Sequence, residues 1–524
     1  MRSRASLLIF LAVIAVGAEV SAQSPENLFE AGRKAFQDGM YVMAGRNFRE
    51  LTDQYPDNPL ADDAEYLGAV ADFYLGEFES CVAALRSYSR KYPRSANNSR
   101  VSYWLGSAYF QLLDYTESLS HLKNQVDNYP EEQPYYDHGL LLKGMVEENL
   151  SMWSAARESY QKVLSRDGAR ELWPEALYRS GGIALRSADY SEALTAFSRI
   201  LVEFPDSVYA GEAVFFVAEC SFFLGRYPDA ERGYRSVLKA DPTPEQWQTS
   251  LYRLALILSE VGRSAEALEH CAELRLRFPN SRYGELLLRL EADLLFDLER
   301  YGEAYDAYRR ALRTSSDPDE LQVIHYNTGL SAYLSGNLGG SVKPFESALQ
   351  GSSGIAEQSL FRLASVQAEL GRVEQAAERF EEFRLRYPSS SDREEATRTL
   401  ASLYEQRRPQ EALALYTELI TRYPDSPYQD EYLFRRGSVR LRSGSAAAAL
   451  KDFFTLTERW PGSAYAAESS YNIGYIYSQR GEFKRGIPFF EEVLRSNPPP
   501  ELAGRAALAA GVCAYNAGDY REAV

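Results

Sequence analysis

The sequence of 524 residues predicts an all-α fold in which short helical hairpins stack one after another, an α-solenoid. First, a small residue recurs fourteen times at a nearly constant step of 37 residues. Second, a large residue follows it four positions later, on the same helix face. Third, a proline follows the large residue after eight further positions in most units. A repeat of this length is typical of solenoids built from helix–turn–helix units.

The second helix of each unit is expected to carry the small and the large residue in the core. A small residue lets a neighbouring helix approach closely, and the large one fills the space beside it. The small residues are Ala44, Cys81, Ser118, Ala156, Ala193, Ala230, Ala267, Ala304, Ser341, Ala376, Ala412, Ala449, Gly486 and Ala523. The large residues are Phe48, Leu85, Leu122, Tyr160, Phe197, Tyr234, Cys271, Tyr308, Phe345, Phe380, Tyr416, Phe453 and Phe490.

A first helix is expected before each second helix, with an aromatic residue fifteen positions ahead of the small one. In ten units this residue is Phe29, Tyr66, Tyr103, Tyr178, Phe215, Tyr252, Tyr326, Phe361, Phe434 and Tyr471. The turn between the two helices contains glycine in segments such as 75–78, 224–227 and 370–373. Glycine suits a helix end because it takes left-handed dihedral angles freely.

Each unit is expected to end at a proline, because proline cannot continue a helix. These prolines are Pro56, Pro93, Pro130, Pro205, Pro242, Pro279, Pro388, Pro424, Pro461 and Pro498. Two residues later comes a residue that we expect to cap the next first helix: Asn58, Ser95, Ser207, Ser281, Ser390, Ser426 or Ser463. In two cases a proline follows directly, which predicts Pro59 and Pro427 at the first helical position.

The order of glycine, turn, aromatic, alanine, aromatic and proline resembles the tetratricopeptide repeat over residues 25–524. The usual unit of that family has 34 residues. The longer unit, with segments such as 103–106 and 423–427, is similar to bacterial envelope proteins of the family, such as the TolA-binding periplasmic protein and the repeat lipoprotein of the β-barrel assembly machine. The resemblance implies a right-handed superhelix of about fourteen units, the last one incomplete, whose first helices line a concave groove.

The resemblance also implies that a protein or peptide partner binds in that groove. The candidate partner-binding residues are Tyr66, Tyr103, Tyr178, Phe215, Tyr252, Tyr326, Phe361, Phe434 and Tyr471. The alternative is that these rings pack between neighbouring helices as part of the core, where each would stabilise the fold by about 1.5–3 kcal/mol.

The first 22 residues predict an export signal. Arg2 and Arg4 give a positive start, residues 7–16 are apolar, and small residues precede a cleavage site between Ala22 and Gln23. No cysteine follows that site, so a lipid anchor is not expected. The location that this predicts is periplasmic or otherwise extracytoplasmic, with an uncleaved membrane anchor as the alternative.

The composition argues against several other classes of protein. A formal net charge of −17 disfavours nucleic acid as a partner, and no later segment is apolar enough to span a membrane. Four distant cysteines are expected to be buried thiols, with a disulfide between Cys220 and Cys271 as the alternative. No metal-binding histidine pair, phosphate loop or nucleophile motif is present. We therefore expect no metal, no cofactor and no enzyme activity.

The expected organisation is a signal peptide at 1–22, nine units at 23–353 and five units at 354–524, with the last unit cut short at Val524. The boundary follows from a step of 35 residues and from glycines at 351 and 354, which indicate either a hinge or a divergent unit. The predicted function is that of an exported, non-enzymatic scaffold for protein–protein interactions in the bacterial cell envelope. The alternatives are the sensor or binding region of a larger protein with an effector domain beyond residue 524, and an enzyme whose repeats form a substrate arm.

Overall fold

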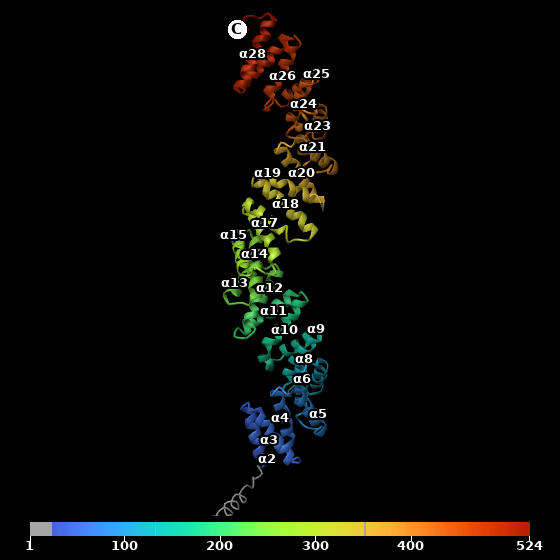
Figure 1. Cartoon of the computed structure of the whole chain (residues 1–524), viewed down its shortest axis with the longest axis vertical. Helices are drawn as coiled ribbons and strands as arrows, with labels where there is room; N and C mark the ends of the chain where they lie inside the picture. The colour runs from blue at the N-terminus through green and yellow to red at the C-terminus, as the bar shows by residue number, and fades with distance from the viewer. Residues whose placement is uncertain (1–23, 132, 351–352, 524) are drawn as a thin grey trace, which may run out of the picture. The chain divides into compact units, whose positions relative to one another are not determined.

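The structure is a computed structural model that describes residues 24–131, 133–350 and 353–523. These residues form 27 α-helices, one 3-10 helix and no strand (Figure 1). This confirms the predicted all-α solenoid. The predicted export signal, including Ala22 and Gln23, lies outside the described residues.

The chain divides into two compact units, Met1–Ile257 and Leu258–Val524. The helices of the first unit are α2 (Pro25–Gln37), α3 (Tyr41–Gln54), α4 (Ala61–Tyr74), α5 (Phe78–Lys91), α6 (Asn98–Gln111), α7 (Tyr115–Asn128), α8 (Tyr136–Asn149), α9 (Trp153–Leu164), the 3-10 helix η1 (Asp167–Leu172), α10 (Trp173–Arg186), α11 (Tyr190–Glu203), α12 (Ala210–Phe223) and α13 (Tyr227–Lys239). The division between the units falls inside α14 (Pro244–Glu260).

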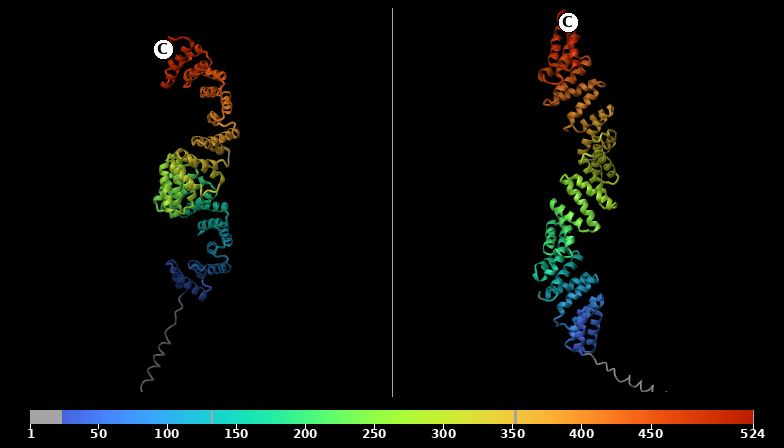
Figure 2. Two further views of the ribbon diagram at one scale, coloured as in Figure 1. Left: turned by 45° about the horizontal axis from the view of Figure 1, so that its top comes forward. Right: turned by 90° about the vertical axis from the view of Figure 1, so that its left-hand side faces the viewer.

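The helices of the second unit are α15 (Ser264–Arg277), α16 (Gly284–Asp297), α17 (Tyr301–Ala311), α18 (Pro318–Leu334), α19 (Leu338–Ser347), α20 (Ser353–Glu369), α21 (Val373–Arg386), α22 (Arg393–Tyr404), α23 (Pro409–Arg422), α24 (Gln429–Arg442), α25 (Ala446–Arg459), α26 (Ala466–Gln479), α27 (Phe483–Arg495) and α28 (Pro500–Ala517). Within each unit, consecutive helices pack side by side along the chain (Figure 2). First helices of adjacent repeats also touch, as α4 touches α6 and α26 touches α28.

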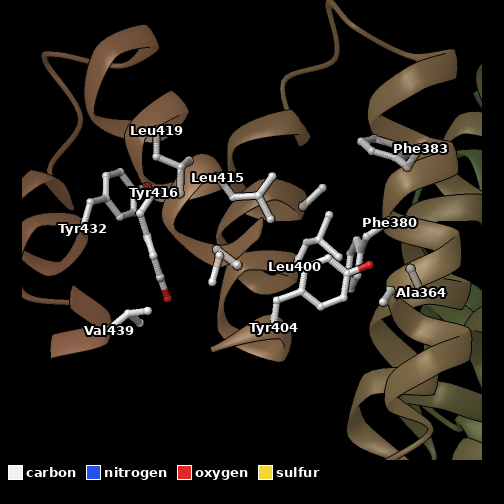
Figure 3. Close-up of a cluster of buried hydrophobic side chains, with 14 of the residues drawn as sticks. Ala364, Phe380, Phe383, Leu400, Tyr404, Leu415, Tyr416, Leu419, Tyr432 and Val439 are labelled. Atoms are coloured by element: carbon white, nitrogen blue, oxygen red, sulfur yellow. The ribbon is translucent and has the colours of Figure 1, made fainter. Parts of the chain in front are cut away.

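The small and large residues of the repeat occupy the core as predicted. The small residue is the fourth residue of each second helix from α3 to α27, and it is buried there. The large residue one turn later is at most 1% exposed in every repeat. Figure 3 shows one such core in the second unit, where Phe380 and Tyr416 come from successive second helices and Leu400 and Tyr432 from the first helices that follow each of them.

A second set of small residues, which the sequence analysis missed, lies twelve positions before the first set. Its members are Gly32, Ala69, Gly106, Gly144, Gly181, Ala218, Ala255, Ala292, Gly329, Ala364, Gly437, Gly474 and Gly511, with Leu400 as the exception. In seven repeats the glycine faces the large residue of its own hairpin. A Cβ atom added at Gly181, for example, would lie 2.7 Å from Phe197 Cζ. The missing side chain therefore makes room for the large one.

In thirteen of the fourteen repeats, all except the one with Ala412, the turn between the two helices of the hairpin contains a left-handed residue five positions before the small one. In nine repeats this residue is glycine, as predicted: Gly39, Gly76, Gly225, Gly262, Gly336, Gly371, Gly444, Gly481 and Gly518. In four repeats another residue takes the same conformation: Leu113, Ser151, Ala188 and Glu299. The geometry of the turn is thus kept even where the residue type is unfavourable.

The prediction that Asn58 and the serines cap the first helices is wrong. The helices begin about three residues later, so Leu60 and Tyr428 hold the cap positions of α4 and α24. Pro59 and Pro427 are accordingly outside the helices. The serine instead closes a tight turn: Ser426 Oγ accepts a hydrogen bond from the amide of Tyr428 at 3.1 Å.

Three of these serines, Ser95, Ser426 and Ser463, also connect neighbouring repeats. The Ser426 hydroxyl donates to Glu394 Oε1 at 2.5 Å, and the Ser463 hydroxyl donates to Asp430 Oδ2 at 2.6 Å. Both acceptors lie in the first turn of the preceding first helix. Ser426 and Ser463 therefore each close a turn and form a polar link to the repeat before it.

The region of the predicted hinge contains a short second helix, α19, with Pro344 inside it. Phe345 of α19 packs with Leu363 and Val366 of α20 in one buried cluster. Residues 351 and 352 lie outside the described part of the chain, so the hinge, the domain boundary at 353/354 and the truncation at Val524 stay predictions.

The four cysteines are free thiols, and each is buried, as the core positions of Cys81 and Cys271 led us to expect. Burial raises the pKa of the Cys81, Cys220 and Cys271 thiols to about 12. These side chains therefore behave as small apolar core residues.

Candidate protein-binding surface

The nine aromatic residues predicted to bind a partner all lie on first helices, and they are less exposed than a free binding surface would be. Tyr66 and Tyr252 are 4% and 8% exposed. The other seven are half-buried: Tyr103, Tyr178, Phe215, Tyr326, Phe361, Phe434 and Tyr471. Each of these seven rings can therefore present only part of its surface to a partner.

These rings are held by packing within their own hairpin. Tyr471 lies 5.6 Å from Phe490 between ring centroids, and Phe434 lies 6.2 Å from Phe453. The partner is in each case the large residue of the second helix, nineteen positions later. Some of them also touch the next repeat, since Phe434 stacks on Tyr465 at 4.9 Å. The half-buried rings therefore pack into the core of their own hairpin and leave part of one face open to solvent.

The first four repeats bring a larger group of rings together, which we call the aromatic surface. It consists of Phe36, Tyr41, Phe73, Tyr74, Phe78, Tyr103, Trp104, Tyr135 and His138. Two stacked pairs stand out, Tyr41 on Tyr74 at 4.7 Å and Tyr103 on Tyr135 at 4.8 Å. Trp104 connects them, because it lies 5.6 Å from Tyr74 and 5.5 Å from Tyr135.

Part of the aromatic surface is open to solvent. Tyr74 is 48% exposed and Tyr135 is 36% exposed, while Trp104 beneath them is buried. Met40, Val42 and Met43, which flank Tyr41 in the sequence, are also exposed. Exposed rings above a buried tryptophan, with adaptable methionines beside them, are features of protein-binding surfaces.

The backbone holds Tyr135 in an uncommon conformation. Its φ angle is +66°, which is unfavourable for a residue with an aromatic side chain. The Gln125 side-chain amide donates to the Tyr135 carbonyl at 2.9 Å, and the Gly139 amide donates to it at 2.7 Å. Local strain of this kind is kept where surrounding contacts fix it, and it is common at functional positions.

Sequence reasoning named Tyr103 of this surface among its candidate partner-binding residues. The signal for Tyr135 was present in the loop at 129–136, where the repeat step is 38 and one extra residue lengthens the junction. Tyr41, Tyr74 and Trp104 are ordinary members of a helical pattern, so only the packing shows that they meet.

The Tyr74 and Tyr103 hydroxyls of the surface stay protonated at neutral pH. Burial raises the pKa of Tyr74, and the neighbouring Tyr135 and Tyr41 raise it as well. The Tyr74 hydroxyl therefore remains a hydrogen-bond donor. Burial likewise raises the pKa of Tyr103. A cavity of about 330 Å³ adjoins Tyr135, and Tyr136, His138 and Arg166 also line it.

Within the described ranges, no group of three or more histidine, cysteine or acidic side chains is placed to hold a metal ion. No helix among these residues is long and apolar enough to span a membrane.

Three family models match the chain. Residues 21–159 match the model described as outer membrane lipoprotein. Residues 174–327 match a tetratricopeptide repeat-like domain, and residues 361–427, 401–464 and 471–524 match a tetratricopeptide repeat. No curated protein matches the chain.

Three solved structures are similar to this chain, each with a TM-score of 0.39 or less. The Cut9–Hcn1 hetero-tetramer of the APC/C is 13% identical, with 97% of this chain and 99% of that chain covered and a TM-score of 0.29. The C-terminal part of a TPR repeat-containing protein from Cytophaga hutchinsonii is 15% identical, with 49% and 99% covered and a TM-score of 0.39. The MamA protein is 18% identical, with 34% and 92% covered and a TM-score of 0.30. The assignment of the fold rests on the helices and the family models.

The fold and the family models together define a helical repeat scaffold of the kind that binds other proteins. The chain belongs to the tetratricopeptide repeat proteins, and its residues 21–159 are similar to the family described as outer membrane lipoprotein.

Proposed function

We propose that this chain is an exported, non-enzymatic scaffold of the bacterial cell envelope that binds a protein or peptide partner on the face of its first helices. The match of residues 21–159 to an outer membrane lipoprotein model supports an envelope location, and so does the signal predicted at residues 1–22. The repeat family supports the role of a binding scaffold. Rigid stacked helices offer a preorganised surface, which lowers the entropic cost of binding.

The aromatic surface of repeats 1–4 is the observation that carries this proposal. The stacked and half-open rings of Tyr74 and Tyr135 lie over the buried indole of Trp104. A partner that covers these rings gains apolar burial at little cost in side-chain entropy, because the rings are already held in place. The other candidate residues, Tyr66, Tyr178, Phe215, Tyr252, Tyr326, Phe361, Phe434 and Tyr471, are proposed as weaker contacts along the same face.

The proposal is tested with the full-length chain by quantitative crosslinking pull-down from the native envelope. We expect the double variant Tyr74→Ala, Tyr135→Asn to capture at least about tenfold less of the partner, since truncation of a central aromatic contact costs roughly 2 kcal/mol. Asparagine is chosen for position 135 because it tolerates the left-handed backbone conformation. Helical content, measured by circular dichroism, is expected to remain unchanged.

Tyr475→Ala is the matched control. Tyr475 is also exposed, at 41%, and lies on the first helix α26 of the second unit, whereas the aromatic surface belongs to the first unit. Equal capture by the double variant and the control would disprove the role of the aromatic surface. N-terminal sequencing of the native protein tests the location separately, because export predicts a chain that begins at Gln23.

A further inference from the structure

An arginine covers a stacked pair of rings in repeats 5–7. Tyr190 of α11 stacks on Phe223 of α12 at 4.6 Å. Arg253 of α14 lies over the Phe223 ring at 4.9 Å and pairs with Glu219 of α12 at 3.4 Å. One first helix therefore supplies the ring and the carboxylate, and the next first helix supplies the cation that both attract.

The same combination recurs in the second unit. Arg505 of α28 lies over the ring of Tyr471 of α26 at 4.3 Å, and it faces Glu468 of α26 at 3.9 Å. Arg398 of α22 likewise lies over the ring of Tyr428 at 4.5 Å. The chain thus places an arginine on an aromatic ring at several contacts between adjacent repeats.

The aromatic surface of repeats 1–4 has the same stacked pair but lacks the cation. Four repeats before the pair that Arg253 covers, Tyr41 stacks on Tyr74 at 4.7 Å. Trp104, which carries no charge, takes the position that Arg253 has in the later pair. In the described part of the chain, no lysine or arginine lies over any ring of the aromatic surface.

Exposed carboxylates lie beside these rings. Glu77 follows Tyr74 by three residues, across a tight turn, and Asp38 lies in the turn that precedes Tyr41. Both acids are exposed, and neither forms an ion pair with a residue that the structure describes. Repeats 1–4, residues 24–164, contain 21 acidic and 13 basic residues. The surroundings of the aromatic surface therefore favour a partner with positive charge.

We propose, on the basis of the proposed function, that the aromatic surface binds a basic segment of the partner protein, one arginine of which stacks on Tyr74 and pairs with Glu77. Trp104 lies between two exposed rings, 5.6 Å from Tyr74 and 5.5 Å from Tyr135, and the rings are inclined to it by 64° and 66°. A flat guanidinium gains cation–π attraction against these rings. Apolar residues next to the arginine cover the exposed Met40.

The test is fluorescence anisotropy of the full-length protein with a short labelled peptide that alternates arginine and leucine. We expect the same peptide with citrulline in place of arginine to bind about tenfold more weakly, because citrulline keeps the shape and removes the charge. Tyr74→Leu and Glu77→Gln are each expected to weaken binding of the arginine peptide about fivefold. Tyr74→Phe is expected to bind within about twofold of the unchanged protein, since phenylalanine keeps the ring face.

Asp53→Asn is the matched control. Asp53 is an exposed acid of the same repeat as Tyr41, but it lies twelve residues further along α3, about 18 Å away. Circular dichroism shows whether each variant is folded. The proposal is overturned if the citrulline peptide binds as well as the arginine peptide, or if Asp53→Asn weakens binding as much as folded Glu77→Gln does.

The proposed function is judged separately, by capture of the native partner. If the double variant Tyr74→Ala, Tyr135→Asn loses the partner while the two peptides bind equally to the unchanged protein, the surface binds a partner but the basic character of that partner is disproved.

Discussion

Two adjacent glycines in α10 differ in the space around them: Gly181 is crowded by a neighbouring side chain and Gly182 is not. A Cβ atom at Gly181 would meet the Phe197 ring at 2.7–3.0 Å, whereas a Cβ atom at Gly182 would meet nothing within 4 Å. We expect Gly181→Ala to destabilise the protein by about 2 kcal/mol, because the ring must move. Gly182→Ala is expected to stabilise it by about 0.5–1 kcal/mol, since alanine favours helix.

The two variants are compared by thermal unfolding followed by circular dichroism. Each is the control for the other, because both make the same chemical change one residue apart. Shifts of the same sign would contradict the view that the glycine makes room for the ring.

The cysteines provide a second test at the scale of single residues. With their pKa raised to about 12, the Cys81, Cys220 and Cys271 thiols are ionised at pH 8 in roughly one molecule in ten thousand. We therefore expect iodoacetamide to leave them unmodified in the folded protein and to modify them rapidly in urea, as measured by mass spectrometry. Rapid modification without denaturant would show that these core positions open easily.

At the scale of the element, the junction serines differ in what they connect. Ser426 bonds to the carboxylate of Glu394 in the preceding repeat, whereas Ser281 only closes its own turn through the amide of Tyr283 at 3.2 Å. We expect Ser426→Ala to destabilise the second unit by about 2 kcal/mol and Ser281→Ala by about 0.5 kcal/mol, because bonds to charged groups contribute more. Denaturant unfolding measures both changes. Equal losses would mean that the link between repeats adds nothing to the turn.

The sequence predicted the hairpins well, because the recurring small residue and the proline stop act within one hairpin. It placed the helix starts wrongly because the Ser426 hydroxyl could serve either as a cap or as a link to Glu394, and the spacing alone does not distinguish the two. The glycines opposite the large residues recur at the same step of about 37 residues, so the sequence alone could have revealed them. The exposure of Tyr74 depends on three helices meeting, which no local pattern encodes.

At the scale of the whole molecule, each helix contacts mainly its neighbours along the chain. In such an array, stability is roughly a sum over repeats and their interfaces, so damage stays local. We expect Gly181→Ala to speed amide hydrogen exchange in α9–α13 and to leave α2–α5 unchanged, as measured by mass spectrometry. A uniform increase across the first unit would instead indicate that the unit unfolds as one cooperative body.

The two sets of small residues, twelve positions apart and repeating together, have a consequence for how such a chain can change in length. Duplication or loss of a complete block of 37 residues keeps both sets in step, so every remaining hairpin still finds its large residue opposite a small one. An insertion of one or two residues inside a helix rotates one set away from the other and places a large side chain against the wrong neighbour. Genetic variation in this chain is therefore expected to add or remove whole repeats and to confine small insertions to the junction loops.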